Sequence, residues 1–339
     1  MPLIDESEVK RQIKENDFAR LYVVCGDEEY LKQHYAAQIC EKAVAEAFRD
    51  FNFHRFEGKD TTVEELAQAL EAYPLGGGRS CVMVRDFPLE GMGSDKNFLA
   101  FLKELPPHGV LVLWMDTAAF HPKKSKALLE AFNAAGHVAQ LNRPDASQMA
   151  RILAGGAKRR GCAMDARTAG YLIETVGGEL NTLLNELEKL CAYAGEGQTI
   201  TNAHVDAVCI KSLDAKSFDM VKAVAAGDGG GALRLLDDLL RQKTAPPMLL
   251  GSLISNYVDV YRAAAALKSR KRPEDLAKVF DYGGKAFRLQ NAGRVAAKMS
   301  MARVVRCLAL LDDADRKLKN SGMDNRLVLE ECLIGLLAG

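Results

Sequence analysis

The sequence lacks the features that would place a protein in or across a membrane. No apolar run approaches the roughly 20 residues that a helix needs to cross a bilayer. The first residues, MPLIDESEVKRQ, are more acidic and more polar than a signal peptide. We therefore expect a cytoplasmic protein with no membrane partner.

Closely spaced cysteine pairs are also missing. The eight cysteines include no C-x-x-C pair, whereas zinc sites place ligands two to four residues apart. Most of them lie in apolar runs such as LYVVC and SCVMV. This pattern predicts buried thiols in a reducing compartment rather than a metal or disulfide framework.

Catalytic constellations are equally absent. The six histidines show neither metal-ligand spacing nor a nucleophile motif, and no serine stands in a G-x-S-x-G sequence. For these polar residues, a capping or solvent-facing position is the simpler interpretation. We expect no catalytic residue, no metal site and no cofactor.

The chain has no net charge overall, but its positive and negative residues are unevenly distributed. The chain has 45 Lys and Arg and 45 Asp and Glu among 339 residues. Residues 1–140 carry a net charge of −6, residues 141–211 are neutral, and residues 212–339 carry +6. Opposite ends of the chain are therefore expected to face different partners. The bias is too mild to indicate a tight nucleic-acid binder by itself.

Strand and helix signals alternate in the first 140 residues. Short apolar runs predict strands at 21–25, 81–84, 110–114 and 137–140, and apolar periodicity predicts helices at 29–48, 61–72, 96–105 and 124–134. Thr61 or Thr62 is expected to cap the second of these helices, because Glu64 and Glu65 follow in capping-box positions. Such alternation is typical of a mostly parallel, doubly wound sheet.

Helices alone are predicted beyond residue 142. They are expected at about 147–160, 165–176, 179–194 and 202–210, and throughout the segment from 212, including 299–318 and 325–338. Short loops between the first four favour an antiparallel bundle. We predict an α/β plus all-α protein of three domains, with bounds 1–142, 143–211 and 212–339.

A parallel sheet followed by a small helical bundle is the layout of an AAA+ ATPase, but the phosphate-binding loop is missing. Such a loop, G-x-x-x-x-G-K-[ST], follows the first strand and surrounds the phosphates with backbone amides. Here the strand is followed by Gly26-Asp27-Glu28-Glu29-Tyr30-Leu31, whose three carboxylates would repel a triphosphate. Asp86 and Asp116 each stand alone at a strand end, where a magnesium site would need an acidic pair. We expect no ATP hydrolysis.

Several stretches, in order along nearly the whole chain, resemble the delta subunits of bacterial DNA polymerase III. They are GDEEYL at 26–31, LAQALEAYPLGGGRSCVMV at 66–84, GGELNTLLNELEKL at 177–190, Ile200-Thr201 and LDDADRKLK at 311–319. Each motif is weak alone, and their order makes the set specific. The chain has neither the clustered cysteines nor the serine-arginine-cysteine motif of the ATPase and delta-prime relatives.

The resemblance implies a clamp-loader subunit that is not catalytic by itself, within a DNA-directed DNA polymerase holoenzyme. It implies a degenerate AAA+ RecA-like sheet domain, a small helical lid domain and a C-terminal helical collar domain. The implied partners are the sliding clamp (the beta subunit), the clamp-loader ATPase subunits (gamma/tau), the delta-prime subunit and primer-template DNA. The expected role in replication is to bind and open the clamp so that it can be loaded on primed DNA.

By the same resemblance, the clamp-binding residues fall on Leu70, Tyr73, Pro74 and Leu75. Apolar anchors of this kind can each contribute about 2 kcal/mol in a partner's pocket. The alternative is that Leu70 and Leu75 face the sheet. The family often places a second bulky residue after the leucine, and Gly76 stands there, which makes Tyr73 a candidate substitute.

One dense basic run stands in the C-terminal part. Lys268, Arg270, Lys271 and Arg272 could contact DNA phosphates, although a solvated loop between helices is the simpler interpretation. Two other functions remain open at this point: a general helical DNA-binding protein, and a divergent nucleotide-dependent enzyme. The first predicts salt-sensitive DNA affinity without other subunits, and the second requires a usable phosphate loop.

Overall fold

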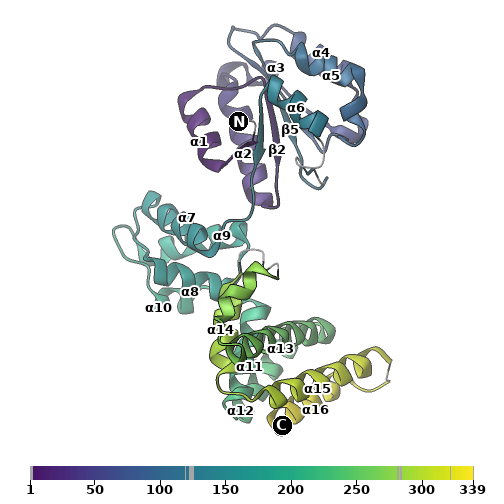
Figure 1. The fold of residues 1–339 in the computed structure, drawn as a ribbon. Helices are drawn as coiled ribbons and strands as arrows, with labels where there is room; N and C mark the ends of the chain where they lie inside the picture. Colours follow the sequence, from purple (N-terminus) through teal and green to yellow (C-terminus); the bar gives the residue numbers. More distant parts are fainter. Residues whose placement is uncertain are drawn as a thin grey trace. The chain divides into compact units, whose positions relative to one another are not determined.

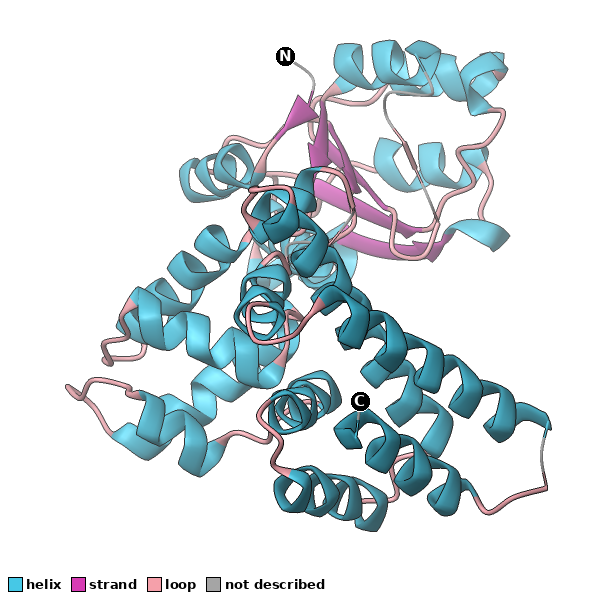
Figure 2. Cartoon of the chain, turned by 60° about the horizontal axis from the view of Figure 1, so that its bottom comes forward, coloured by secondary structure: helices cyan, strands magenta, loops and turns pink. Residues whose placement is uncertain are grey.

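The computed structural model describes residues 3–118, 120–121, 126–280, 282, 285–320 and 322–338. The chain divides into two compact units, Met1–Arg143 and Pro144–Gly339. In the described residues, strands lie in the first unit and the second is built of helices (Figure 2). The predicted α/β plus all-α fold class is confirmed. The finer boundary at 211/212 stays a prediction.

A six-stranded sheet with neighbouring strands parallel forms the centre of the first unit. Its order is β1-β6-β2-β5-β4-β3, so the chain crosses over the sheet between strands. The three central strands are fully or almost fully buried, as expected for apolar runs with helices on both faces. The strands are β1 Leu3–Ile4, β2 Leu21–Cys25, β3 Phe53–Glu57, β4 Ser80–Arg85, β5 Gly109–Trp114 and β6 His137–Gln140.

Helices flank this sheet, as Figure 1 shows for α2, α5 and α6. The expected capping box is present at Thr62: its hydroxyl accepts from the Glu65 amide at 3.3 Å, and the Glu65 carboxylate accepts from the Thr62 amide at 2.8 Å. The helices are α1 Glu6–Glu15, α2 Glu29–Ala43, α3 Arg49–Asn52, α4 Val63–Glu71, α5 Lys96–Lys103 and α6 Lys126–Ala135, with short 3₁₀ turns η1 Glu46–Phe48, η2 Gly58–Asp60 and η3 Met92–Ser94.

Three phenylalanine rings lie together among the aliphatic side chains of the core on one side of the sheet. Phe98 of α5 stacks on Phe87, with ring centroids 5.5 Å apart, and meets Phe132 of α6 edge to face at 6.4 Å. Leu66 and Leu70 of α4 belong to the same buried cluster. They lie four residues apart and therefore share one face of the helix. That face packs into the core.

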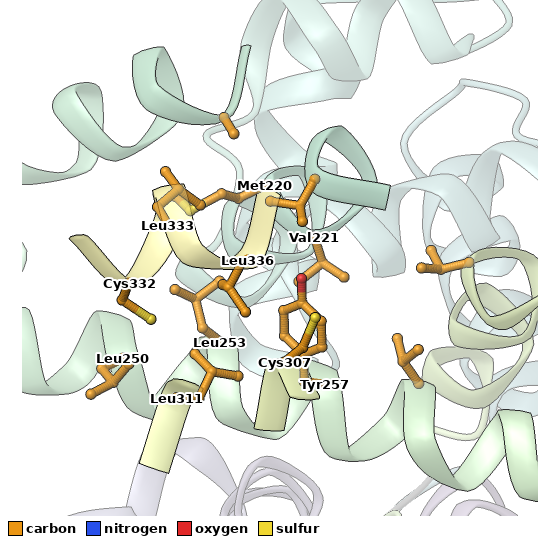
Figure 3. Close-up of a cluster of buried hydrophobic side chains, with 14 of the residues drawn as sticks. Met220, Val221, Leu250, Leu253, Tyr257, Cys307, Leu311, Cys332, Leu333 and Leu336 are labelled. Atoms are coloured by element: carbon orange, nitrogen blue, oxygen red, sulfur yellow. The ribbon is translucent and has the colours of Figure 1, made fainter. Parts of the chain in front are cut away.

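The second unit is helical from end to end in its described part. Its elements are α7 Ala146–Arg159, α8 Ala166–Val176, α9 Leu180–Ala194, α10 Asn202–Val208, α11 Leu213–Ala225, α12 Gly229–Arg241, α13 Pro246–Lys268, η5 Pro273–Lys278, α14 Phe287–Ala296, α15 Met301–Asn320 and α16 Asn325–Ala338. The long α13 lies at the centre and packs on α11, α14, α15 and α16. Figure 3 shows Tyr257 of α13 with Cys307 of α15 and Leu336 of α16 around it.

Arg288 links three of these helices through ion pairs. Arg288 of α14 donates to the Asp259 carboxylate of α13 at 2.8 Å and to the Asp214 carboxylate of α11 at 3.3 Å. Asp259 is almost fully buried and also accepts from the Tyr282 hydroxyl at 2.6 Å. Removing one partner of such a buried pair would leave an uncompensated charge.

Sequence expectations about elements were incomplete at several places, and neither β1 nor α1 was predicted. The helix predicted over 29–48 ends at Ala43, and η1 and α3 follow it. The edge strand β3 was not predicted, because its half-exposed sequence FHRFE contains no continuous apolar run. The expected helix start at Lys124 lies outside the described residues, within which α6 begins at Lys126.

The cysteine prediction agrees with the structure. All eight cysteines are free and buried. Burial raises the pKa of the Cys25 thiol to about 12, so this sulfur stays protonated and unreactive at neutral pH.

Candidate functional site

The loop after β2 is closed by another part of the same chain. Gly26 has a φ of +125°, and a Cβ at this position would lie 2.0 Å from the Leu141 carbonyl oxygen. The same carbonyl accepts from the Glu28 amide at 3.2 Å, and the Asp27 carboxylate accepts from the Arg143 amide at 2.9 Å. The segment after β6 therefore lies directly against the loop and engages its backbone.

The lysine in the first turn of α2, the helix that follows this loop, is also engaged within the chain. Lys32, in the first turn of α2, is buried, and its Nζ donates to the carbonyl oxygens of Met115 at 2.9 Å and Asp116 at 2.8 Å. A phosphate-binding lysine needs to present its ammonium to the ligand. These contacts favour the expectation that this loop binds no nucleotide, which itself stays a prediction.

Asp86 and Asp116, the two lone carboxylates at strand ends, make contacts between the segments that follow β4 and β5. Asp86, with a left-handed φ of 52°, accepts from the amides of Asp116, Thr117 and Ala118 at 2.8 to 3.0 Å. The Thr117 hydroxyl donates to the same carboxylate at 2.7 Å, and Arg85 pairs with Asp116 at 2.7 Å. Their use as turn and strand-end contacts agrees with the interpretation that neither is a metal ligand. Within the residues described, no group of three or more His, Cys, Asp or Glu side chains could hold a metal ion.

This cluster predicts a pH dependence of stability. Burial opposes ionisation of Asp86, but the hydrogen bonds from Ala118 and Thr117 outweigh it and lower the pKa of the carboxyl. Its contribution to stability is therefore present above the unfolded pKa of about 3.9 and is lost as the pH falls through the lower native pKa. Asp86→Asn, which tolerates the same φ, should be less stable than the parent chain at neutral pH.

Urea unfolding of both proteins between pH 7 and about pH 3 tests this, since the gap in stability should shrink toward the acidic end. Glu71→Gln, at an exposed carboxylate of the same unit, is the control. A gap that stays constant over the whole range would show that the Asp86 charge does not stabilise the strand ends.

The four residues expected to contact a partner lie in two different environments. Leu70 is 0% exposed and packs in the core, and Pro74 is buried as well. Tyr73 is 86% exposed and Leu75 is 51% exposed, both in the loop 72–79 that follows α4. Leu70 therefore faces the sheet, as the alternative interpretation of the sequence predicted. Of the four, only Tyr73 and Leu75 present an exposed side chain to a partner.

The 72–79 loop is fixed by side chains distant in sequence. Asn52, which is buried, accepts from the Leu75 amide at 2.8 Å and donates to the Leu75 carbonyl at 3.0 Å. The Tyr73 ring lies on His108, with centroids 4.8 Å apart. The loop therefore holds its exposed side chains in a defined position.

Sequence reasoning missed the residues that support this loop. Asn52 and His108 are 23 and 35 positions away from the loop residues they contact. Phe48 lies against Gly76, and the neighbouring Phe51 is exposed. No motif marks these residues in the sequence, and the exposure of Phe51 in the segment FRDFNF can be recognised only in the structure.

The basic run lies at the end of α13. Lys268, Arg270, Lys271 and Arg272 are all exposed there, in the turn before η5. Arg272 lies 3.6 Å from the Asp275 carboxylate. The position suits a solvated turn and leaves contact with DNA a prediction.

Among the described residues, no helix is long and apolar enough to cross a membrane.

Comparison with known proteins places these features in one family. The model of "DNA polymerase III, delta subunit" matches residues 22–139, and that of "DNA polymerase III delta subunit, C-terminal domain" matches residues 214–336. The DNA polymerase III subunit delta of Bacillus subtilis (strain 168) is 22% identical over 344 residues, covering 97% of this chain and 96% of the relative. An Aquifex aeolicus (strain VF5) protein, "Probable DNA polymerase III subunit delta", is 23% identical over 274 residues, covering 78% and 75%.

A solved structure agrees over nearly the full length. The Bacillus subtilis DNA clamp loader delta protein has a TM-score of 0.67 and 20% identity, and the match covers 98% of this chain and 99% of that one. The two family models match the sheet unit and the C-terminal helices in the order in which the resembling motifs occur. The chain therefore belongs to the DNA polymerase III delta-subunit family.

Proposed function

We propose that this chain is the subunit of a replicative clamp loader that binds the sliding clamp and opens it for loading on primed DNA. Exposed Tyr73 and Leu75 on a loop held by Asn52 carry the proposal, because large apolar side chains on a rigid loop suit insertion into a partner's pocket. Family membership supports the sliding clamp as the proposed partner. A replication role also makes the cytoplasm the proposed location.

Assembly with other subunits is proposed for the C-terminal segment from residue 212. Large apolar side chains are exposed in the described part of this segment at Leu233, Met248, Tyr261, Leu267, Val279, Phe280, Val305, Met323, Leu327 and Ile334. Where such side chains are grouped, they mark an interaction surface. The proposed partners are the ATPase subunits and the delta-prime subunit, in a collar through which primer-template DNA could pass. Mixing the full chain with these subunits and measuring co-elution on a sizing column tests the assembly.

The central experiment measures binding of the full chain to the sliding clamp of the same organism without nucleotide. Clamps placed on nicked circular DNA should then be released faster when the chain is added, because opening the ring lets it leave. Binding without faster release would support recognition and contradict opening.

The two alternative functions make different predictions in the same assays. A helical DNA-binding protein would bind duplex DNA without the clamp, with an affinity that falls steeply as salt rises. A nucleotide-dependent enzyme would bind ATP in a magnesium-dependent titration, despite the engaged loop at Gly26. Neither alternative predicts binding to the clamp.

A further inference from the structure

The first unit exposes few large apolar side chains, and they occur in two neighbouring segments. Over its described residues (3–118, 120–121 and 126–143), the large apolar side chains that remain exposed are Phe51, Tyr73 and Leu75. Phe51 is 66% exposed and lies in the single-turn helix α3, outside the loop that carries the other two. Single exposed apolar residues are ordinary, but grouped ones mark interaction surfaces.

Asn52 joins the two segments. Its amide makes both hydrogen bonds to the backbone of Leu75, so the residue next to Phe51 is fixed to the residue proposed as an anchor. Asn52 itself is buried, so leaving its side-chain amide unpaired would be costly. The relative position of α3 and the loop is therefore set before any partner binds.

Phe48 explains why no bulky residue follows Leu75. Gly76 has a φ of +75°, and a Cβ there would lie 2.2 Å from Cε2 of Phe48. The ring of Phe48 thus occupies the space beside the loop in which a larger side chain at 76 would begin. Phe48 ends η1 and Phe51 lies in α3 directly after it, so the segment that carries Phe51 is also the segment that packs on the loop at Gly76.

We infer that Phe51 is a further clamp-contact residue, in addition to Tyr73 and Leu75. Phe51, Tyr73 and Leu75 are exposed on two chain segments joined by Asn52. The inference rests on the proposed function, and the sliding clamp is the occupant because Asn52, next to Phe51, is hydrogen-bonded to the backbone of the proposed anchor Leu75. An aromatic side chain is the type most often found to dominate binding energy at such interfaces.

The test uses the full chain and the clamp in titrations of Phe51→Ala, Phe51→Gln, Tyr73→Ala/Leu75→Ala and the parent protein. Each Phe51 variant should weaken binding about 10- to 30-fold, the range of a moderate hot-spot residue. Thermal unfolding should be unchanged, because Phe51 is largely exposed. Ile210→Ala, at a 78% exposed apolar residue of the second unit, is the matched control and should bind as the parent does.

The outcomes separate this inference from the proposed function. Phe51 variants that bind like the parent, while the Tyr73/Leu75 variant loses binding, would overturn the inference and leave the proposed function intact. A parent chain that binds no clamp, alone or assembled with its loader partners and ATP, would overturn both. Should Phe51→Ala fail to fold, Phe51→Gln decides the question with a polar side chain suited to an exposed position.

Discussion

Replacing Tyr73 and Leu75 together with alanine is expected to weaken clamp binding at least about 100-fold. Two apolar anchors at roughly 2 kcal/mol each would amount to about 1000-fold if additive, and hot-spot residues are seldom additive. Both side chains are largely exposed, so the free energy of unfolding should change little. Equilibrium titration of labelled clamp measures the Kd, and urea unfolding measures stability.

A matched control comes from the second unit. Tyr193 is 61% exposed and contacts the ring of His204 edge to face, as Tyr73 contacts His108 in a tilted arrangement, and Ile210 is exposed like Leu75. Tyr193→Ala/Ile210→Ala therefore removes a similar amount of exposed apolar surface and should bind the isolated clamp as tightly as the parent. Equal losses in both double variants would show that the effect is not specific to the 72–79 loop.

The sequence predicted best what short segments encode by themselves. The runs LYVVC and GVLVLW became buried central strands, and the Thr62–Glu65 capping box formed as its spacing indicated. Such features depend on neighbours three or four residues away or on continuous apolarity. The edge strand β3 was missed because an edge position needs no such continuity.

The candidate site was only partly predictable for a related reason. The fragment AYPLGGG indicated an apolar loop, but the contacts that orient it come from Asn52, Phe48 and His108, which are far away in sequence. A polar amide in FRDFNF gives no sign that it will bind the backbone of Leu75. The division of the four predicted residues into two buried and two exposed could come only from the folded chain.

The degenerate loop at Gly26 and the 72–79 loop support one interpretation together. In the first, the Glu28 amide and the Lys32 ammonium are used by Leu141, Met115 and Asp116 within the chain. In the second, the chain fixes a backbone while leaving the apolar side chains in solvent. This arrangement favours the proposed role of the sheet unit as a rigid support for partner binding over a role in binding a nucleotide.

Leu70→Ala is expected to destabilise the chain by about 3 kcal/mol without weakening clamp binding by the folded protein. Removing a fully buried leucine side chain loses its transfer free energy and leaves a cavity, with typical losses of about 2 to 5 kcal/mol. Leu70 is 0% exposed, and its neighbour on the same helix face, Leu66, is buried too. Urea unfolding measures the loss, and clamp titration at low temperature measures the affinity.

Comparison of Leu70→Ala with the Tyr73→Ala/Leu75→Ala variant shows which residues act as clamp anchors and which as core residues. A core residue changes stability and leaves the contact surface alone, whereas an anchor changes affinity and leaves stability alone. Leu66→Ala, from the same face of α4, is the matched control and should behave like Leu70→Ala in both assays. A loss of affinity in Leu70→Ala that is absent from Leu66→Ala would mean that α4 unwinds on binding and that Leu70 enters the clamp after all.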